Sequence, residues 1–116
     1  MKNYECMSDF EINKRVFKAI VGAKPLGYPH NADGRSVGNE ENGNYRWYDY
    51  CNNPADAWPI IDENNITIIN DNPSMRLAVN DAAECYNGFR GIIASSDENG
   101  LRAAMIVFLK MNEDKL

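Results

Sequence analysis

The sequence has few of the residues that metal sites and histidine-dependent catalysis require. Its 116 residues include one histidine, His30, and three cysteines, Cys6, Cys51 and Cys85. Without a second histidine or a Cys-x-x-C pair, neither a zinc site nor a catalytic triad has a local signature. We therefore predict no metal ion, no cofactor and no catalytic set, and we expect His30 to lie in a surface loop.

Long apolar runs and an excess of basic charge are missing as well. The longest apolar run, residues 103–109, is far too short to cross a bilayer. Seventeen acidic against twelve basic residues give a net charge of −5, which opposes binding to a phosphate backbone. We therefore expect no membrane attachment, and nucleic acid is disfavoured as a partner, while a homo-oligomer stays open.

The cysteine count is odd, and the N-terminus lacks the basic and apolar blocks of a signal peptide. Both features favour a cytoplasmic protein with free thiols, so no intramolecular disulfide is expected.

The remaining composition is that of an ordinary globular protein, with 44% hydrophobic and 25% charged residues. A chain of this length can bury a core as one domain. From residue 22 to 53 the composition shifts to Gly, Pro, Asn and Tyr, with turn dipeptides at 33–34 and 42–43. We predict a single domain over residues 1–116, in which 22–53 is an irregular, loop-rich insertion.

Capping residues predict two helices in the first half of the chain. Ser8 and Glu11 form a capping box for a helix over 8–21, and Gly22 suits its end. Asn53 and a proline at the first helical position predict a second helix over about residues 54–64. Pro59 removes one hydrogen bond there, so we expect this helix to bend or to restart after residue 58.

Asn99 predicts the start of a third helix, over residues 101–112, with Ser96 and Asp97 as competing caps. Its apolar residues extend nearly round the cylinder, so it should be heavily buried. Trp58 and Phe108 are expected to be large core anchors. An arginine in the first turn opposes the helix dipole unless it has a partner, and for Arg102 we favour an exposed side chain over a paired one.

Strand-forming runs are found at residues 45–50, 66–69, 75–79 and 88–94. The second and third are separated by about five turn residues, which predicts an antiparallel hairpin. Residues 80–87 fit either one helical turn or a loop. The pattern as a whole predicts an α+β fold, with a small antiparallel sheet of about three to five strands layered with about three helices.

Three segments together resemble a known family: residues 8–16 (SDFEINKRV), 51–61 (CNNPADAWPII) and 101–109 (LRAAMIVFL). They are similar to the NinX-type proteins of tailed bacteriophages and enterobacterial prophages, whereas residues 22–44 and 82–91 do not match the pattern. The resemblance implies a small cytoplasmic protein of the host cell, encoded in a phage accessory region. The family has no assigned biochemical function, so no catalytic residues carry over.

Our functional hypothesis is a non-catalytic protein that binds a host defence protein or a small signalling molecule. Alternation along strand 45–50 places Arg46, Tyr48 and Tyr50 on one face and Tyr45 and Trp47 on the other. Arginine and tyrosine suit recognition of a partner or of a planar ligand. The predicted binding residues are Arg46, Tyr48, Tyr45 and Tyr50, with Arg46 and Tyr48 as the exposed pair and Trp47 nearer the core.

The alternative is a small hydrolase-type enzyme acting on a phage- or host-derived metabolite. Its candidate groups are Cys51 or Cys85 with His30, or the following carboxylates: Asp49, Asp56 and Asp62. Their spacing forms no known catalytic signature. An acidic mimic of nucleic acid is a weaker hypothesis still, because basic residues are interleaved with the acidic ones.

Overall fold

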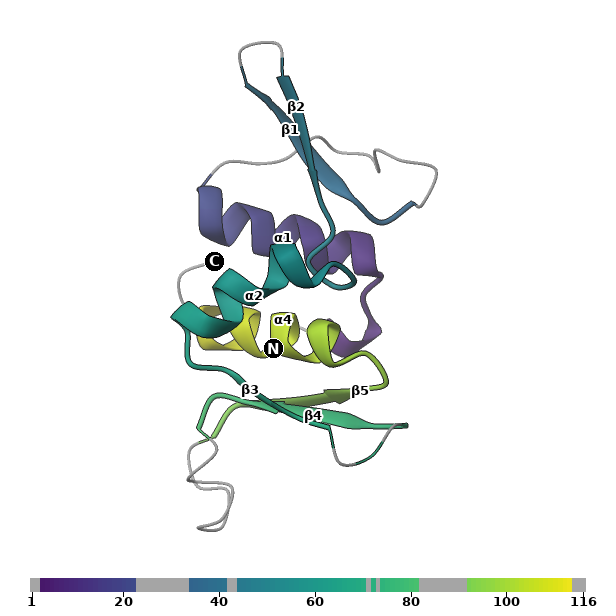
Figure 1. Cartoon of the computed structure of the whole chain (residues 1–116), viewed down its shortest axis with the longest axis vertical. Helices are drawn as coiled ribbons and strands as arrows, with labels where there is room; N and C mark the ends of the chain where they lie inside the picture. Colours follow the sequence, from purple (N-terminus) through teal and green to yellow (C-terminus); the bar gives the residue numbers. More distant parts are fainter. Residues whose placement is uncertain are drawn as a thin grey trace.

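The computed structural model describes residues 3–22, 34–41, 44–70, 72, 74–81 and 92–113, without the side chains of 39–41, 44 and 45. His30, Cys85, the 42–43 turn and the undecided segment 82–87 lie outside this part. The described elements are η1 (Tyr4–Cys6), α1 (Asp9–Val21), β1 (Val37–Glu41), β2 (Asn44–Tyr48), α2 (Pro54–Glu63), β3 (Thr67–Ile69), β4 (Arg76–Val79), β5 (Ala94–Asp97) and α4 (Gly100–Met111). They form the predicted α+β fold, with two small antiparallel sheets in place of one (Figure 1).

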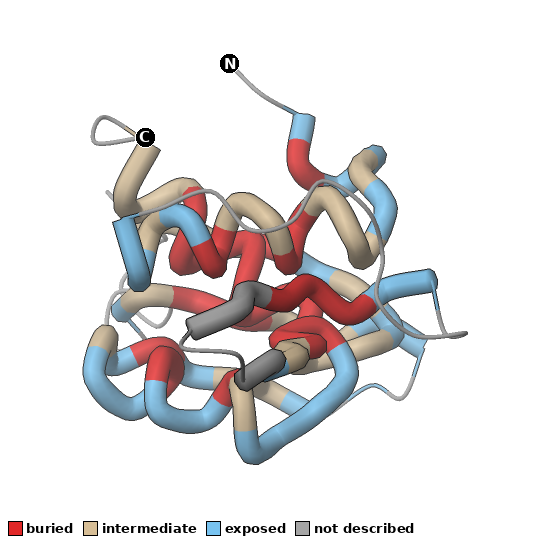
Figure 2. Tube along the Cα trace, turned by 90° about the horizontal axis from the view of Figure 1, so that it is seen from above, coloured by how far each residue is buried: buried red, intermediate tan, exposed pale blue. Residues whose placement is uncertain are grey.

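Helix α4 is the centre of the core. It contacts all three strands of the β3–β4–β5 sheet on one side and α1 and α2 on the other (Figure 1). Residues 102–109 are all buried, and buried segments gather in the middle of the molecule in Figure 2. The Asn99 side chain caps the helix by accepting hydrogen bonds from the Leu101 and Arg102 N–H groups, at 3.0 and 3.3 Å. Both the predicted cap and the predicted burial are confirmed.

Helix α1 also follows the prediction at both ends. The Ser8 hydroxyl accepts a hydrogen bond from the Glu11 N–H at 3.1 Å. Gly22 has a φ of 80°, and its N–H donates to the Lys18 carbonyl at 2.9 Å. Glycine adopts this left-handed conformation without the strain that a Cβ would cause, so the helix ends there.

Helix α2 starts as predicted, with the Asn53 side chain accepting from the Ala55 N–H at 3.0 Å, but it runs unbroken through Pro59. The prediction that Trp58 is a core anchor is wrong, since Trp58 is 57% exposed. Ala57 and Ile60 point into the core, and consecutive helical residues are about 100° apart, so Trp58 falls on the flank.

The three-stranded sheet has the order β3–β4–β5, with both pairs antiparallel. Ile68, Ala78 and Ser95 lie opposite one another on the face toward α4. The predicted 66–69 and 75–79 hairpin is confirmed. Of the strand predicted at 88–94, residues 88–91 lie outside the described part, residues 92 and 93 are not in a strand, and β5 begins at Ala94. Asn80, which follows β4, exchanges two hydrogen bonds with the backbone of Ile93, which precedes β5, at 2.8 and 3.1 Å.

Strands β1 and β2 pair with each other in a hairpin that projects from the helical body, and we refer to residues 37–48 as the arm (Figure 1). Strand β2 covers most of the predicted strand 45–50 but ends at Tyr48, so Asp49 and Tyr50 lie beyond it. Strand β1 was not predicted, because its sequence VGNEE has one apolar side chain. Trp47 is half-buried and lies against Gly38, where a Cβ would come within 1.7 Å of its ring. The indole therefore covers the arm's own backbone, and the prediction that it lies nearer the core than Tyr48 is wrong.

Candidate functional site

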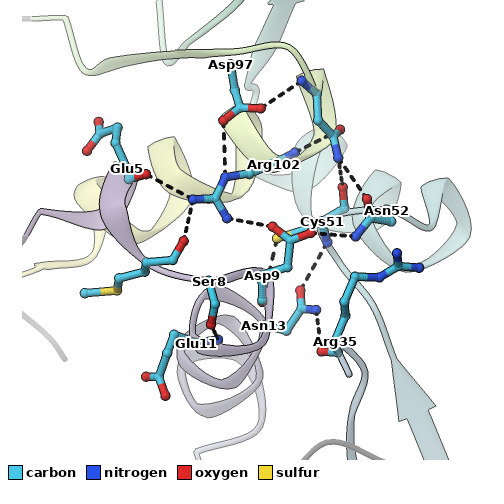
Figure 3. A network of polar contacts seen from close by, with 12 residues as sticks. Glu5, Ser8, Asp9, Glu11, Asn13, Arg35, Cys51, Asn52, Asp97 and Arg102 are labelled. Atoms are coloured by element: carbon cyan, nitrogen blue, oxygen red, sulfur yellow. Dashed lines mark hydrogen bonds and ion pairs between the residues drawn. The ribbon is translucent and has the colours of Figure 1, made fainter. Parts of the chain in front are cut away.

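Residues 49–53, which we call the central turn, lie where the N-termini of α1, α2 and α4 converge (Figure 3). The Asp49 carbonyl accepts hydrogen bonds from the Asn52 and Asn53 N–H groups, at 3.1 and 2.8 Å. The Asp49 N–H donates to the Asp56 carboxylate at 3.0 Å, which ties the turn to the first turn of α2. These hydrogen bonds shape the turn without any contribution from α1 or α4.

Arg102 carries the central charge of this region and is almost fully buried. Its guanidinium contacts the Asp9 carboxylate at 2.7 Å and the Asp97 carboxylate at 3.2 Å. It also donates to the Glu5 and Met7 carbonyls, at 3.2 and 2.6 Å (Figure 3). Burial alone would lower the pKa of Arg102, but the hydrogen bond and charge of Asp9, together with smaller contributions that include the charge of Asp97, raise it. The prediction of an exposed Arg102 is therefore wrong, and the partners resolve its conflict with the helix dipole.

Asn13 connects α1 to the base of the arm. Its amide nitrogen donates to the Arg35 carbonyl at 3.0 Å and to the Asp49 carboxylate at 2.9 Å, and its oxygen accepts from the Cys51 N–H at 3.1 Å. The Arg35 guanidinium in turn contacts Asp49 at 3.0 Å. Since Arg35 precedes β1 and Asp49 follows β2, these bonds clamp both ends of the arm to α1.

Asn99 and Asn52 complete the junction. The Asn99 amide donates to the Cys51 carbonyl at 2.6 Å and to the Asn52 side chain at 3.0 Å. Asn52 donates to the Asp9 carboxylate at 3.0 Å. The asparagine that caps α4 therefore also holds the central turn, and one set of polar side chains joins three helix N-termini.

Three of the described candidates for enzyme chemistry, Cys51, Asp49 and Asp56, have structural roles, whereas Asp62 is exposed on α2. Cys51 is buried, and burial together with the nearby Asp9 charge raises the pKa of its thiol, which opposes the thiolate that a nucleophile needs. Asp49 and Asp56 accept the hydrogen bonds that shape the central turn. Among the described residues no three His, Cys, Asp or Glu side chains lie close enough to hold a metal ion. This junction holds the fold together.

The predicted binding residues, on β2 and just after it, are partly brought together. Arg46 is exposed, whereas Tyr48 is half-buried, with its ring 5.9 Å from that of Phe17. Tyr48 and Tyr50 stack face to face with centroids 5.6 Å apart, which confirms that they share one side of the chain. Tyr50 is 5% exposed, and burial raises the pKa of its hydroxyl. The Tyr45 side chain lies outside the described part.

Two open grooves flank α2. The smaller, about 260 Å³, lies between α2 and the end of α1, and its walls include Ile20, Val21, Tyr48 and Tyr50. The larger, about 450 Å³, which we call the Trp58 groove, lies between α2, the β3–β4 hairpin and the start of α4. The residues of this larger groove that bear on recognition are Pro54, Trp58, Ile68, Asn70, Arg76 and Glu98.

Sequence reasoning missed the Trp58 groove because it assigned Trp58 to the core by residue type. The helical spacing of α2 contained the signal: the set Ala57, Ile60 and Ile61 forms one apolar stripe, and residue 58 lies beside it. Arg76 offered no local signal, because its place in the groove depends on the pairing of β4 with β3 and β5.

The fold and its contacts define a small α+β protein in which the polar residues at the helix starts mainly join the elements. In the described part, no helix is long and apolar enough to span a bilayer. A family model described as "Bacteriophage P22, NinX" matches residues 3–112, so the chain belongs to that family. Membership supports a phage-encoded accessory protein. No curated protein matches the chain.

Proposed function

We propose that this protein is a non-catalytic binding protein, acting in the host cytoplasm, that uses the arm to engage a host protein, with a defence protein as the expected target. The observation that carries the proposal is the projection of the arm away from the body (Figure 1). Its strands pair only with each other in the described part of the chain. A lone two-stranded hairpin is marginally stable, so clamping one outward by buried polar bonds favours a role outside the core.

Arg46 is the part of the arm best placed for such a contact. It is exposed, and it lies directly opposite Asn39 in the β1–β2 register. Arginine is enriched at protein interfaces, where its planar group makes several hydrogen bonds at once. Tyr48 and Tyr50 lie at the base of the arm, where both line the smaller groove beside α2.

The test is capture of partners from host lysate by tagged wild-type protein, by Arg46→Glu and by a charge-matched control, Lys18→Glu. Lys18 is exposed on α1 and is not part of the arm. We expect one partner to be retained by wild type and by Lys18→Glu and to be lost by Arg46→Glu, provided that all three have the same denaturation midpoint. Retention at full affinity by Arg46→Glu would reject the arm as the site.

A small signalling molecule is the second candidate ligand, favoured by the exposed indole and the guanidinium in the Trp58 groove. The captured material should therefore also be denatured and its small molecules identified by mass spectrometry. Turnover of a released metabolite would favour the hydrolase alternative instead.

A further inference from the structure

Trp58 is a large aromatic residue on the exposed flank of α2. An indole gains more from burial than most side chains, yet 57% of this one faces solvent. Pro54 lies one helical turn before it and lines the same groove, so this side of α2 presents an apolar and aromatic wall. An exposed aromatic face beside a groove is a stacking platform for another ring.

The opposite side of the Trp58 groove combines positive charge with hydrogen-bonding groups. Arg76 is half-buried on β4, and its guanidinium donates to the Glu98 carbonyl at 2.7 Å, which fixes its direction. The side chains of Asn70 and Arg76 converge on Gly100, where an added Cβ would lie 3.7 Å from the Asn70 oxygen and 3.4 Å from the Arg76 Cδ. The absence of a side chain at residue 100 keeps this side of the groove open.

We propose that the Trp58 groove binds a mononucleotide, with the base stacked on Trp58 and the phosphate held by Arg76. The cavity of about 450 Å³ falls within the usual range for small-molecule sites. A nucleobase offers both a flat ring for the indole and amide or amino edges for Asn70 and Glu98. The proposal rests on the second candidate function, binding of a small signalling molecule, and specifies the class of that molecule. It does not depend on the binding role of the arm.

A single nucleotide fits the groove better than a nucleic acid strand. The chain carries a net charge of −5, which opposes a polymer of phosphates but not one phosphate beside one arginine. Glu98 also lines the groove, and its negative charge opposes a ligand that carries many phosphates.

The test uses the two tryptophans of the intact chain as reporters. The indole N–H signals of Trp47 and Trp58 are followed by ¹H–¹⁵N NMR and assigned with Trp58→Phe, while AMP, GMP, CMP, UMP or adenosine is added. We expect the Trp58 signal to shift with saturation by at least one nucleotide at about 1 mM or below, and the Trp47 signal to stay in place. Absence of any shift at about 5 mM of all four nucleotides would overturn the proposal.

Matched variants separate the two contacts. Trp58→Leu removes the aromatic face and should weaken binding about fivefold or more, whereas Trp58→Phe should retain most of it. Arg76→Gln should remove the preference for AMP over adenosine while leaving adenosine binding unchanged. Met75→Ala, next to Arg76 but outside the groove lining, is the control and should bind as wild type. Binding at wild-type strength by Trp58→Leu would exclude the groove as the site.

The same titration with an eight-residue oligothymidylate distinguishes a free nucleotide from a single strand. Tighter binding of the strand, with affinity falling steeply as salt is raised, would assign the groove to nucleic acid and overturn the proposal. Loss of nucleotide binding with partner capture by the arm intact would remove this inference and leave the proposed protein-binding function standing.

Discussion

Arg102 shows at the scale of one residue how this protein uses buried charge. Its guanidinium contacts Asp9 and Asp97 and two backbone carbonyls, so truncation would leave two partly buried carboxylates without their cation. We expect Arg102→Met to lower the free energy of unfolding by about 3–5 kcal/mol. Arg102→Lys should recover only part of this loss, because an ammonium group cannot reach four acceptors in fixed directions. Urea denaturation midpoints measure both effects.

The control for this prediction is the partly exposed ion pair of Lys14 with Glu11 on α1, whose charged atoms lie 3.6 Å apart. Lys14→Met should change stability by under about 1 kcal/mol, since solvent screens such pairs. Equal losses for Lys14→Met and Arg102→Met would show that the Arg102 contacts contribute no more than a surface pair.

Because Trp58 is exposed, its truncation should cost much less stability than is usual for a tryptophan. Phe108 is 6% exposed on the central helix, so Phe108→Ala should destabilise the protein by about 3–5 kcal/mol. Trp58→Ala removes a side chain that is mostly in solvent and should cost about 1 kcal/mol or less. Chemical denaturation of the two variants in parallel tests this, and a Trp58→Ala loss as large as that of Phe108→Ala would place the indole in the core.

At the scale of the element, the arm depends on glycine at residue 38. A Cβ there would lie 1.7 Å from the Trp47 ring and 2.7 Å from the Arg46 carbonyl oxygen. Gly38→Ala should therefore displace the indole and loosen the β1–β2 pairing while α4 stays packed. Hydrogen exchange should show faster exchange at residues 37–48 and unchanged protection in α4. In a Trp47→Ala background the same change should have a smaller effect, and equal effects in both backgrounds would argue against this packing.

Helix ends could be predicted from the sequence because their signals are local. Ser8, Asn53 and Asn99 each cap a helix by accepting from N–H groups two or three residues ahead, and such bonds can be inferred from neighbouring residue types. The β3–β4 pairing was equally accessible, since a short turn joins the strands. The predicted binding role of β2 stays a prediction, although the stacking of Tyr48 and Tyr50 on one side of the chain was foreseen.

Contacts between distant parts of the chain could not be predicted. Arg102 pairs with Asp9, which lies 93 positions away, and no pattern near either residue indicates the other. Strand β1 has one apolar residue, so its strand character derives from pairing with β2. The exposure of Trp58 depends on which stripe of α2 meets α4, and that choice is made by the packing of the whole domain.

At the scale of the whole molecule, the junction at the central turn should make unfolding cooperative. Cys51 lies inside that junction, and burial raises the pKa of its thiol, so it should react only when the three helices separate. Cys6 is exposed and should be alkylated at once. We expect the native protein to alkylate Cys51 at least about a thousandfold more slowly than Cys6, as global opening is that rare in a stable domain.

Asn13→Ala provides the matched test of that coupling, because Asn13 is fully buried and bonds both Asp49 and the Cys51 N–H. It should speed alkylation of Cys51 by the factor by which it destabilises the protein, about tenfold for each 1.4 kcal/mol, and leave Cys6 unchanged. Peptide mass spectrometry over time measures both rates. After denaturation without reductant, intact mass should show three alkylated thiols. One alkylated thiol would mean that two cysteines form a disulfide. If Asn13→Ala leaves the alkylation rate of Cys51 unchanged, the central turn opens locally, without separation of the helices.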